Sequence, residues 1–158
     1  MNREAREFLR HTIATLAYRC SKTLRDAPID FANFKTEQTV NTPVFLLSHI
    51  ADLLEWALTA TRGEPKYPTT EISDWELEKQ RFYTALKTLD DFLASEVVID
   101  ASLEKIFQGP IADALTHTGQ LALLRRMAGA PIKGESYFVA DIITGLVNED
   151  QPTPKREF

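Results

Sequence analysis

Residues 42–61 read TPVFLLSHIADLLEWALTAT, and this stretch decides the fold class. Threonine can cap the free amides of a first helical turn and proline is tolerated in that turn, so Thr42 and Pro43 predict a helix start. Apolar side chains then recur at helical spacing to about Thr61, and they are Leu46, Ile50, Leu53, Leu54 and Ala57. The helix is predicted to end before Gly63, because the glycine and prolines of GEPKYP (residues 63–68) cannot continue it.

Two more segments carry the same kind of spacing. Residues 3–25 are predicted to form the first helix, and its apolar positions are Ala5, Leu9, Ile13, Leu16 and Cys20. Ser73 and Glu76 have the spacing of a capping box, which predicts the start of a third helix. Its apolar positions alternate by four and three residues, as in a helix of a bundle, and are Phe82, Leu86, Leu89 and Leu93.

The last bundle helix is predicted to be introduced by Gly109 and Pro110 and to run to Met127, before Gly129. Four such helices predict an all-α four-helix bundle that forms a single domain over residues 1–150. Its predicted core is apolar and drawn from all four helices: Leu9, Ile13, Leu16, Ile50, Leu53, Phe82, Leu86, Leu89, Leu121 and Leu124.

The connections between these helices are predicted to be long. Residues 26–41 have no sustained period and are expected to form a connection packed by Phe31 and Phe34. Residues 96–107 fit either an extended connection or a short helix, and both alternatives stay open at this point. A short closing helix is predicted over residues 137–147, and the polar tail of residues 151–158 is predicted to be mobile or loosely docked.

Composition favours a soluble globular domain. The chain has 158 residues, of which 44% are hydrophobic and 26% charged. Its net charge of −5 and pI of about 5.2 disfavour a nucleic-acid partner, since domains that bind nucleic acid usually carry a basic surface. No apolar stretch approaches the roughly 20 residues that span a bilayer, and the charged N-terminus lacks a signal-peptide core. We therefore expect a cytoplasmic protein with neither a membrane nor a nucleic-acid partner.

One cysteine and one basic pair are candidate functional groups. Cys20 is the only cysteine, which excludes an intrachain disulfide and a thiolate metal cluster and fits a reducing compartment. On a predicted helix it is expected to be a small core residue rather than a nucleophile. Arg125 and Arg126 are expected to lie at a helix C-terminus, where cations are favourable, with binding of phosphate or another acidic ligand as the alternative.

Two of the three histidines lie on predicted bundle helices and suggest a metal site. His49 flanks the apolar stripe of the second helix, so its side chain is expected at or near the bundle interior. Asp113 and His117 are four residues apart, which places them one turn apart on one face of the last helix. Two imidazoles and a carboxylate suit a first-row divalent metal such as zinc, nickel, iron or manganese. The alternative is a metal-free bundle in which these groups make ordinary hydrogen bonds.

Six polar residues are secondary candidates for lining a pocket or for orienting ligands: His11, Tyr18, Asp52, Gln120, Glu135 and Tyr137. The aspartate could accept a hydrogen bond from a ligand histidine, and the glutamine could orient a bound water. His11 and Tyr18 on the first helix could form a pocket wall or donate a proton. Glu135 and Tyr137, after the last helix, could line the mouth of the pocket. Solvation or packing explains each of them equally well, and no catalytic residue is assigned.

The second helix with its histidine and the stretch GPIADALTHTGQLALLRRMAG (residues 109–129) resemble the DinB and YfiT-like bundle superfamily. The resemblance covers nearly the whole chain and implies a four-helix bundle, often a homodimer. It also implies a metal held by one histidine on the second helix and an H-x-x-x-H pair on a later helix. His49 matches the first ligand and His117 the second histidine of the pair, whereas Asp113 stands in place of the first.

Two functions follow as expectations. Some proteins of the family that the chain resembles are thiol S-transferases, which implies a metal-dependent transferase or hydrolase acting on a small molecule or a low-molecular-weight thiol. The alternative is a non-catalytic, stress-associated bundle that keeps the pocket and binds a small ligand or partner. The sequence contains no recognisable nucleophile elbow or glycine-rich phosphate loop that would favour another chemistry.

Overall fold

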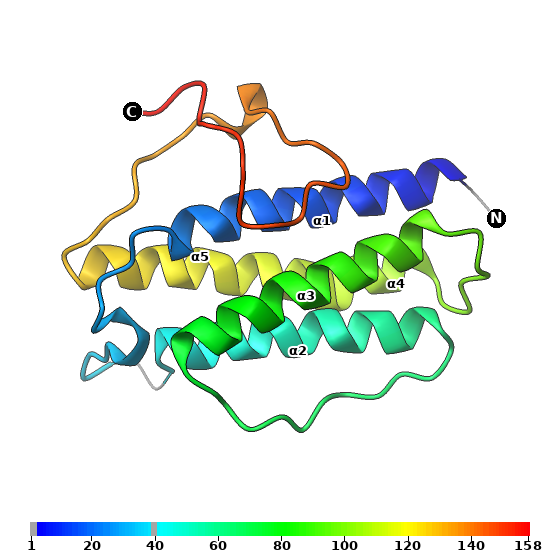
Figure 1. The fold of residues 1–158 in the computed structure, drawn as a ribbon, viewed down its shortest axis with the longest axis horizontal. Helices are drawn as coiled ribbons and strands as arrows, with labels where there is room; N and C mark the ends of the chain where they lie inside the picture. The colour runs from blue at the N-terminus through cyan, green and yellow to red at the C-terminus, as the bar shows by residue number, and fades with distance from the viewer. Residues whose placement is uncertain (1–2, 39–40) are drawn as a thin grey trace.

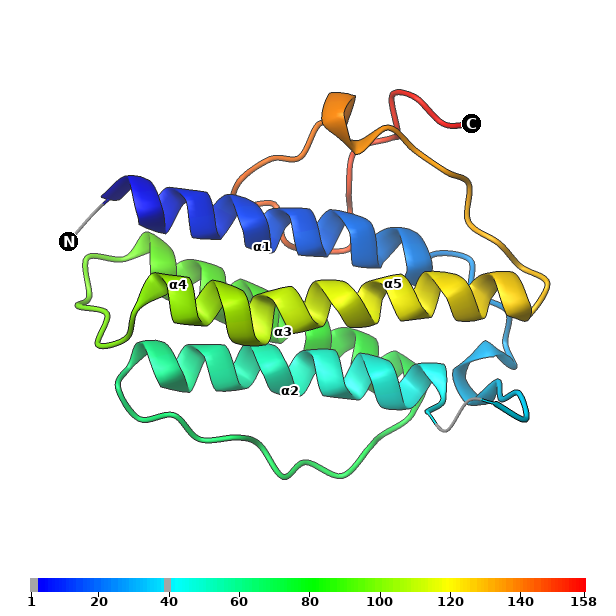
Figure 2. The same cartoon turned by 180° about the vertical axis from the view of Figure 1, so that it is seen from behind.

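The computed structural model describes residues 3–38 and 41–158, which form an all-α fold (Figures 1 and 2). Its long helices are α1 (Arg3–Leu24), α2 (Pro43–Thr61), α3 (Trp75–Ala94) and α5 (Ala112–Met127). A short helix, α4 (Leu103–Ile106), leads into α5 through a π-helical turn, η2 (Phe107–Ile111). The short 3-10 turns are η1 (Phe31–Asn33) and η3 (Tyr137–Val139). The β pairing within the described ranges is an isolated bridge between Glu135 and Glu157.

The apolar faces of the long helices meet in one core. α1 and α2 each pack against both α3 and α5. All ten residues of the predicted core are buried, and the most exposed of them, Leu124, exposes 4% of its surface. Phe31 is buried and Phe34 packs against the same core, which confirms the aromatic packing predicted for this connection. Residues 39–40 of that connection lie outside the described residues.

The starts of α2 and α3 show where side-chain capping was predicted well and where it was not. The Thr42 side chain accepts a hydrogen bond from the amide of Phe45 at 3.3 Å, as the sequence predicts for α2. For α3 the predicted cap at Ser73 is wrong by one residue. Asp74 is the cap and accepts from the amide of Leu77 at 3.0 Å, because a carboxylate is as good a cap as a hydroxyl.

The predicted start of the last helix at Gly109 and Pro110 is also wrong. The continuous helical segment begins at Leu103 in α4, where the Ser102 side chain accepts from the amide of Lys105, and it passes through Pro110 in η2 into α5. Proline lacks an amide hydrogen and crowds the preceding turn, and here the chain widens locally into a π turn. Of the two alternatives for residues 96–107, the first part is an extended connection and the second part is helical.

The C-terminal segment is irregular, so the predicted closing helix over residues 137–147 is wrong. Only Tyr137–Val139 form a 3-10 turn, and Gly145 has a φ of +90°, outside the helical region. The tail is docked by two backbone hydrogen bonds, from Ser136 to Arg156 and from Phe158 to Gly134, each at 3.0 Å. In Figure 1 this segment leaves the end of α5, passes above α1 and crosses in front of it.

Helix α2 is long and apolar enough to cross a membrane by length and composition alone. Half of its most apolar stretch is buried inside the fold, where it packs against α3 and α5. The core helix of a soluble protein has these same properties, so the fold is compatible with a soluble protein.

Candidate metal site

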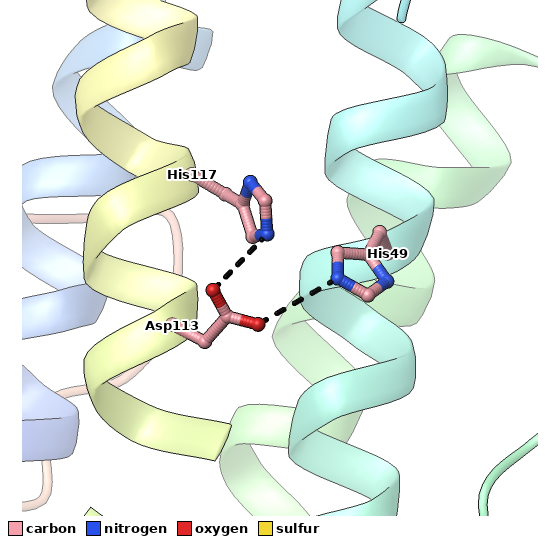
Figure 3. Close-up of side chains that lie close together, drawn as sticks. All are labelled: His49, Asp113 and His117. Carbon is pink, nitrogen blue, oxygen red and sulfur yellow. Dashed lines mark ion pairs between the residues drawn. The ribbon is translucent and has the colours of Figure 1, made fainter. Parts of the chain in front are cut away.

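His49 on α2 faces Asp113 and His117 on the neighbouring helix α5 (Figure 3). The Nε2 atom of His117 lies 3.3 Å from Oδ1 of Asp113, and Nε2 of His49 lies 3.8 Å from Oδ2 of the same carboxylate. One donor atom from each residue lies within 4.8 Å of the others. The arrangement is the one expected from a four-residue spacing on one helix opposite a histidine on its neighbour.

These separations fit a small divalent ion with modest movement of the side chains. Donors bound at about 2.1 Å to one tetrahedral ion lie about 3.4 Å apart. The Asp113–His117 pair already meets this distance, whereas the His49 donor atom lies within 4.8 Å of the other two and has to move toward them. Two imidazole nitrogens and a carboxylate oxygen are also a donor set that zinc, nickel, iron and manganese accept.

Each of the two histidines contacts a partner through its Nδ1 atom, and its Nε2 atom lies near the Asp113 carboxylate, at the centre of the candidate site. The hydroxyl of Tyr67 lies 2.8 Å from Nδ1 of His49, and the Oε1 atom of Gln120 lies 2.8 Å from Nδ1 of His117. When Nδ1 carries the proton and donates to these oxygens, the Nε2 lone pair is free to bind a metal. Gln120 thus contacts the imidazole directly through its side-chain oxygen.

The surroundings of His49 and Tyr67 favour the neutral forms of both side chains. Burial and the neighbouring His117 lower the pKa of His49, against a smaller opposing effect of Asp113. Burial, together with the charges of Asp52 and Asp113, raises the pKa of Tyr67. At neutral pH His49 is therefore an uncharged imidazole, the form that binds metals, and Tyr67 keeps its hydroxyl proton.

The centre is open to solvent on one side. The Asp113 side chain exposes 49% of its surface, against 27% for His49 and 17% for His117. The ring of Phe45 stacks beside His49, with 6.4 Å between centroids, and forms part of the rim. A ligand can therefore approach the three donor groups from the side of Asp113.

Four of the secondary candidates lie away from this centre. His11 contacts the Thr144 hydroxyl at 3.2 Å, beside the C-terminal segment. Tyr18 donates a hydrogen bond to Glu135 at 2.6 Å, and its ring meets that of Tyr137 edge-on. These contacts form a separate cluster between α1 and the C-terminal segment.

Asp52 lies near the centre but is held by another group. Its carboxylate pairs with Arg81 of α3, which also binds Glu55 at 2.8 Å and Glu78 at 3.4 Å. The predicted hydrogen bond from a ligand histidine to Asp52 is therefore not formed, because the guanidinium group is the stronger partner. Asp52 acts on His49 and Tyr67 through its charge alone.

Sequence reasoning did not identify Tyr67 or Phe45. Phe45 precedes His49 by four residues, so helical spacing could have placed their rings together. Tyr67 lies in the irregular connection between α2 and α3, where no spacing rule predicts which side chain returns to the helix.

Comparison of the chain with protein-family models, with curated proteins and with solved structures finds no match.

Proposed function

We propose that this protein binds one divalent metal ion, zinc, nickel, iron or manganese, through His49, Asp113 and His117. A single observation carries the proposal: three donor atoms from two helices lie within 4.8 Å of one another. The hydrogen bonds at Nδ1 of both imidazoles support it, because partners of this kind fix the ring orientation of metal-binding histidines.

The proposed site suits metal-dependent transfer or hydrolysis. The chemistry that a divalent ion supplies in such a site is a lowered pKa of a bound water or thiol, which gives a nucleophile at neutral pH. The residues of the chain hold and orient the reactants: the exposed side of Asp113 admits them, and the Phe45 ring offers an apolar surface beside His49. We propose a small molecule or a low-molecular-weight thiol as the substrate class.

Membership of the DinB and YfiT-like superfamily is part of this proposal, and so are a homodimeric state and a cytoplasmic location. The support is the position of His49 on α2 and of His117 on α5, together with the all-helical fold. Asp113 departs from the family pattern at the first position of the pair. A carboxylate binds harder metals better than an imidazole does, so this change favours iron or manganese relative to the family's ligand set.

The alternative is a metal-binding or ligand-binding bundle without turnover. One observation favours it: the residues considered as proton donors, His11 and Tyr18, contact other groups away from the centre. Tyr67 is the nearest proton-bearing side chain, and its hydroxyl is engaged with His49.

Titration calorimetry of the metal-stripped protein with zinc, nickel and manganese tests the proposal. The parent is expected to bind one ion per chain, and His117→Ala is expected to lose most of the affinity while keeping its helical circular dichroism. His11→Ala is the matched control and should bind like the parent. Parent-like binding by a folded His117→Ala protein would show that the proposed site is wrong.

A further inference from the structure

A cavity of about 380 Å³ lies between α5 and the C-terminal segment. Its α5 wall consists of residues spaced to form one stripe of the helix: Gly119, Ala122, Leu123 and Arg126. Gly119 follows His117 by two residues, or about 200° around the helix, so this stripe faces away from the candidate metal site. The volume lies within the range of small-molecule pockets.

The cavity has apolar walls and a cationic rim. Leu123 and Phe158 line it while exposing 54% and 82% of their surfaces, which leaves apolar side chains uncovered at its mouth. Arg126 and Lys133 also line it, and both are exposed. Lys133 makes a 3.5 Å ion pair with Glu157, whereas Arg126 has no ion pair with any described residue.

The carboxylate of Glu135, which lines the cavity and is buried, already has hydrogen-bond partners at both oxygens. The side chain of Glu135 is fully buried, and its two oxygens accept hydrogen bonds from the Tyr18 hydroxyl at 2.6 Å and from Lys22 at 2.7 Å. Lys22 neutralises this carboxylate, so Glu135 neither repels an anion nor offers a site for a cation. Among the side chains that line the cavity, the cations Arg126 and Lys133 outnumber the carboxylate Glu135 by one charge.

The neighbouring arginine has a different role. Arg125 is buried and donates hydrogen bonds to the backbone carbonyls of Thr23, Arg25 and Ala130 at 2.8 to 2.9 Å. These bonds tie the end of α1 to the end of α5. Of the basic pair considered for acidic ligands, only Arg126 is therefore available to a ligand.

We propose that this cavity binds a small amphipathic carboxylate. The carboxylate lies against Arg126 and Lys133, and the hydrocarbon part covers Leu123 and Phe158. An inorganic anion would leave the apolar walls uncovered, and an organic cation would be repelled by the rim. The site is separate from the metal centre, so either can be present without the other.

Titration of the full chain with octanoate, followed by amide chemical shifts in nitrogen-labelled protein, tests this proposal. We expect saturable shifts that cluster on residues 119–126 and 132–135. Octylamine and inorganic phosphate serve as matched probes for the wrong charge and for the missing hydrocarbon. Both are expected to bind at least about tenfold more weakly than octanoate, because each lacks one half of the interaction. Binding of either as tightly as octanoate, or no saturable octanoate binding, overturns the proposal.

Two variants locate the site. Gly119→Phe should abolish octanoate binding, since a side chain built at Gly119 meets no atom within 4 Å and so projects into open space. Arg126→Gln combined with Lys133→Gln should weaken binding by about tenfold or more. His117→Ala is the control and should bind octanoate like the parent. Parent-like binding by a folded Gly119→Phe protein places the ligand elsewhere and overturns the assignment.

Discussion

The hydroxyl oxygen of Tyr67 lies 2.8 Å from Nδ1 of His49, although the two residues are 18 positions apart in the chain. Tyr67 belongs to the long connection that runs along α2 (Figure 1), and its ring meets that of Trp56 edge-on at 5.9 Å. The contact fixes the His49 ring with Nε2 toward Asp113. Tyr67 is therefore a positioning residue for the proposed metal ligand.

Tyr67→Phe is expected to weaken metal binding by about 10- to 100-fold, the usual effect of losing a hydrogen-bond partner of a ligand histidine. The phenyl ring can keep the packing against Trp56, so the fold should be unchanged. Titration calorimetry of the metal-stripped variant gives the affinity, and circular dichroism checks the helical content.

Tyr137→Phe is the matched control for this change, because its ring packs against Tyr18 on another side of the molecule. It should bind metal like the parent. Equal affinities for Tyr67→Phe and the parent would show that the tyrosine hydroxyl does not orient a metal ligand.

Asp113→His is expected to strengthen zinc and nickel binding by about tenfold or more, because a third imidazole suits these ions better than a carboxylate. The change also completes an H-x-x-x-H pair with His117 on α5. The side chain is half exposed, so the larger ring can be accommodated. Asp113→Asn, which keeps the size but removes the charge, should weaken binding. Unchanged zinc affinity in both variants would place residue 113 outside the coordination sphere.

The helical core was predictable because apolar residues that recur at helical spacing mark the buried face of each helix. Leu9, Ile50 and Leu121 lie on three different helices, and each is buried as its spacing indicated. The helix start at Leu103 was not predictable in the same way. Gly109 and Pro110 resemble a helix boundary, and only tertiary packing decides that the chain passes them through a π turn.

The candidate site was partly predictable for the same reason. Helical spacing places Asp113 and His117 on one face, and the packing of α2 against α5 brings His49 opposite. The contacts of Tyr67 and of the docked tail depend on where irregular segments of the chain pack against the bundle. Such contacts between distant residues leave no periodic signal in the sequence.

Metal affinity is expected to fall as the pH drops below about 6.5, because protons compete for the imidazole nitrogens. The fall should be about tenfold per pH unit for each protonated ligand histidine. Burial lowers the pKa of His49, so this residue should resist protonation to a lower pH than an exposed histidine. Affinities measured at pH 5.5, 6.5 and 7.5 check the profile. A flat profile would exclude histidine ligands, and His11→Ala should leave the profile unchanged.

The cluster of Tyr18, Lys22 and Glu135 is expected to make stability depend on alkaline pH. Burial and the hydrogen bond to Glu135 raise the pKa of Tyr18 above its ordinary value of 10.0. Burial lowers the pKa of Lys22, but its hydrogen bonds to Glu135 and Glu157 outweigh this effect and raise the pKa above 10.5. In this cluster the folded chain therefore keeps two protons that the unfolded chain releases. The stability that these two protons supply is fully present below about pH 10 and is lost as the pH rises further.

Urea unfolding between pH 8 and pH 11 measures this loss, which can reach about 1.4 kcal/mol per pH unit for each retained proton. Tyr18→Phe removes one of the two protons from the balance, so the free energy of unfolding should fall less steeply above pH 10 in this variant. Tyr137→Phe removes a hydroxyl outside the Glu135 hydrogen bonds and should follow the parent curve. If Tyr18→Phe shows the parent's full slope, the Tyr18 hydroxyl keeps no extra proton in the folded chain and its hydrogen bond to Glu135 does not contribute to alkaline stability.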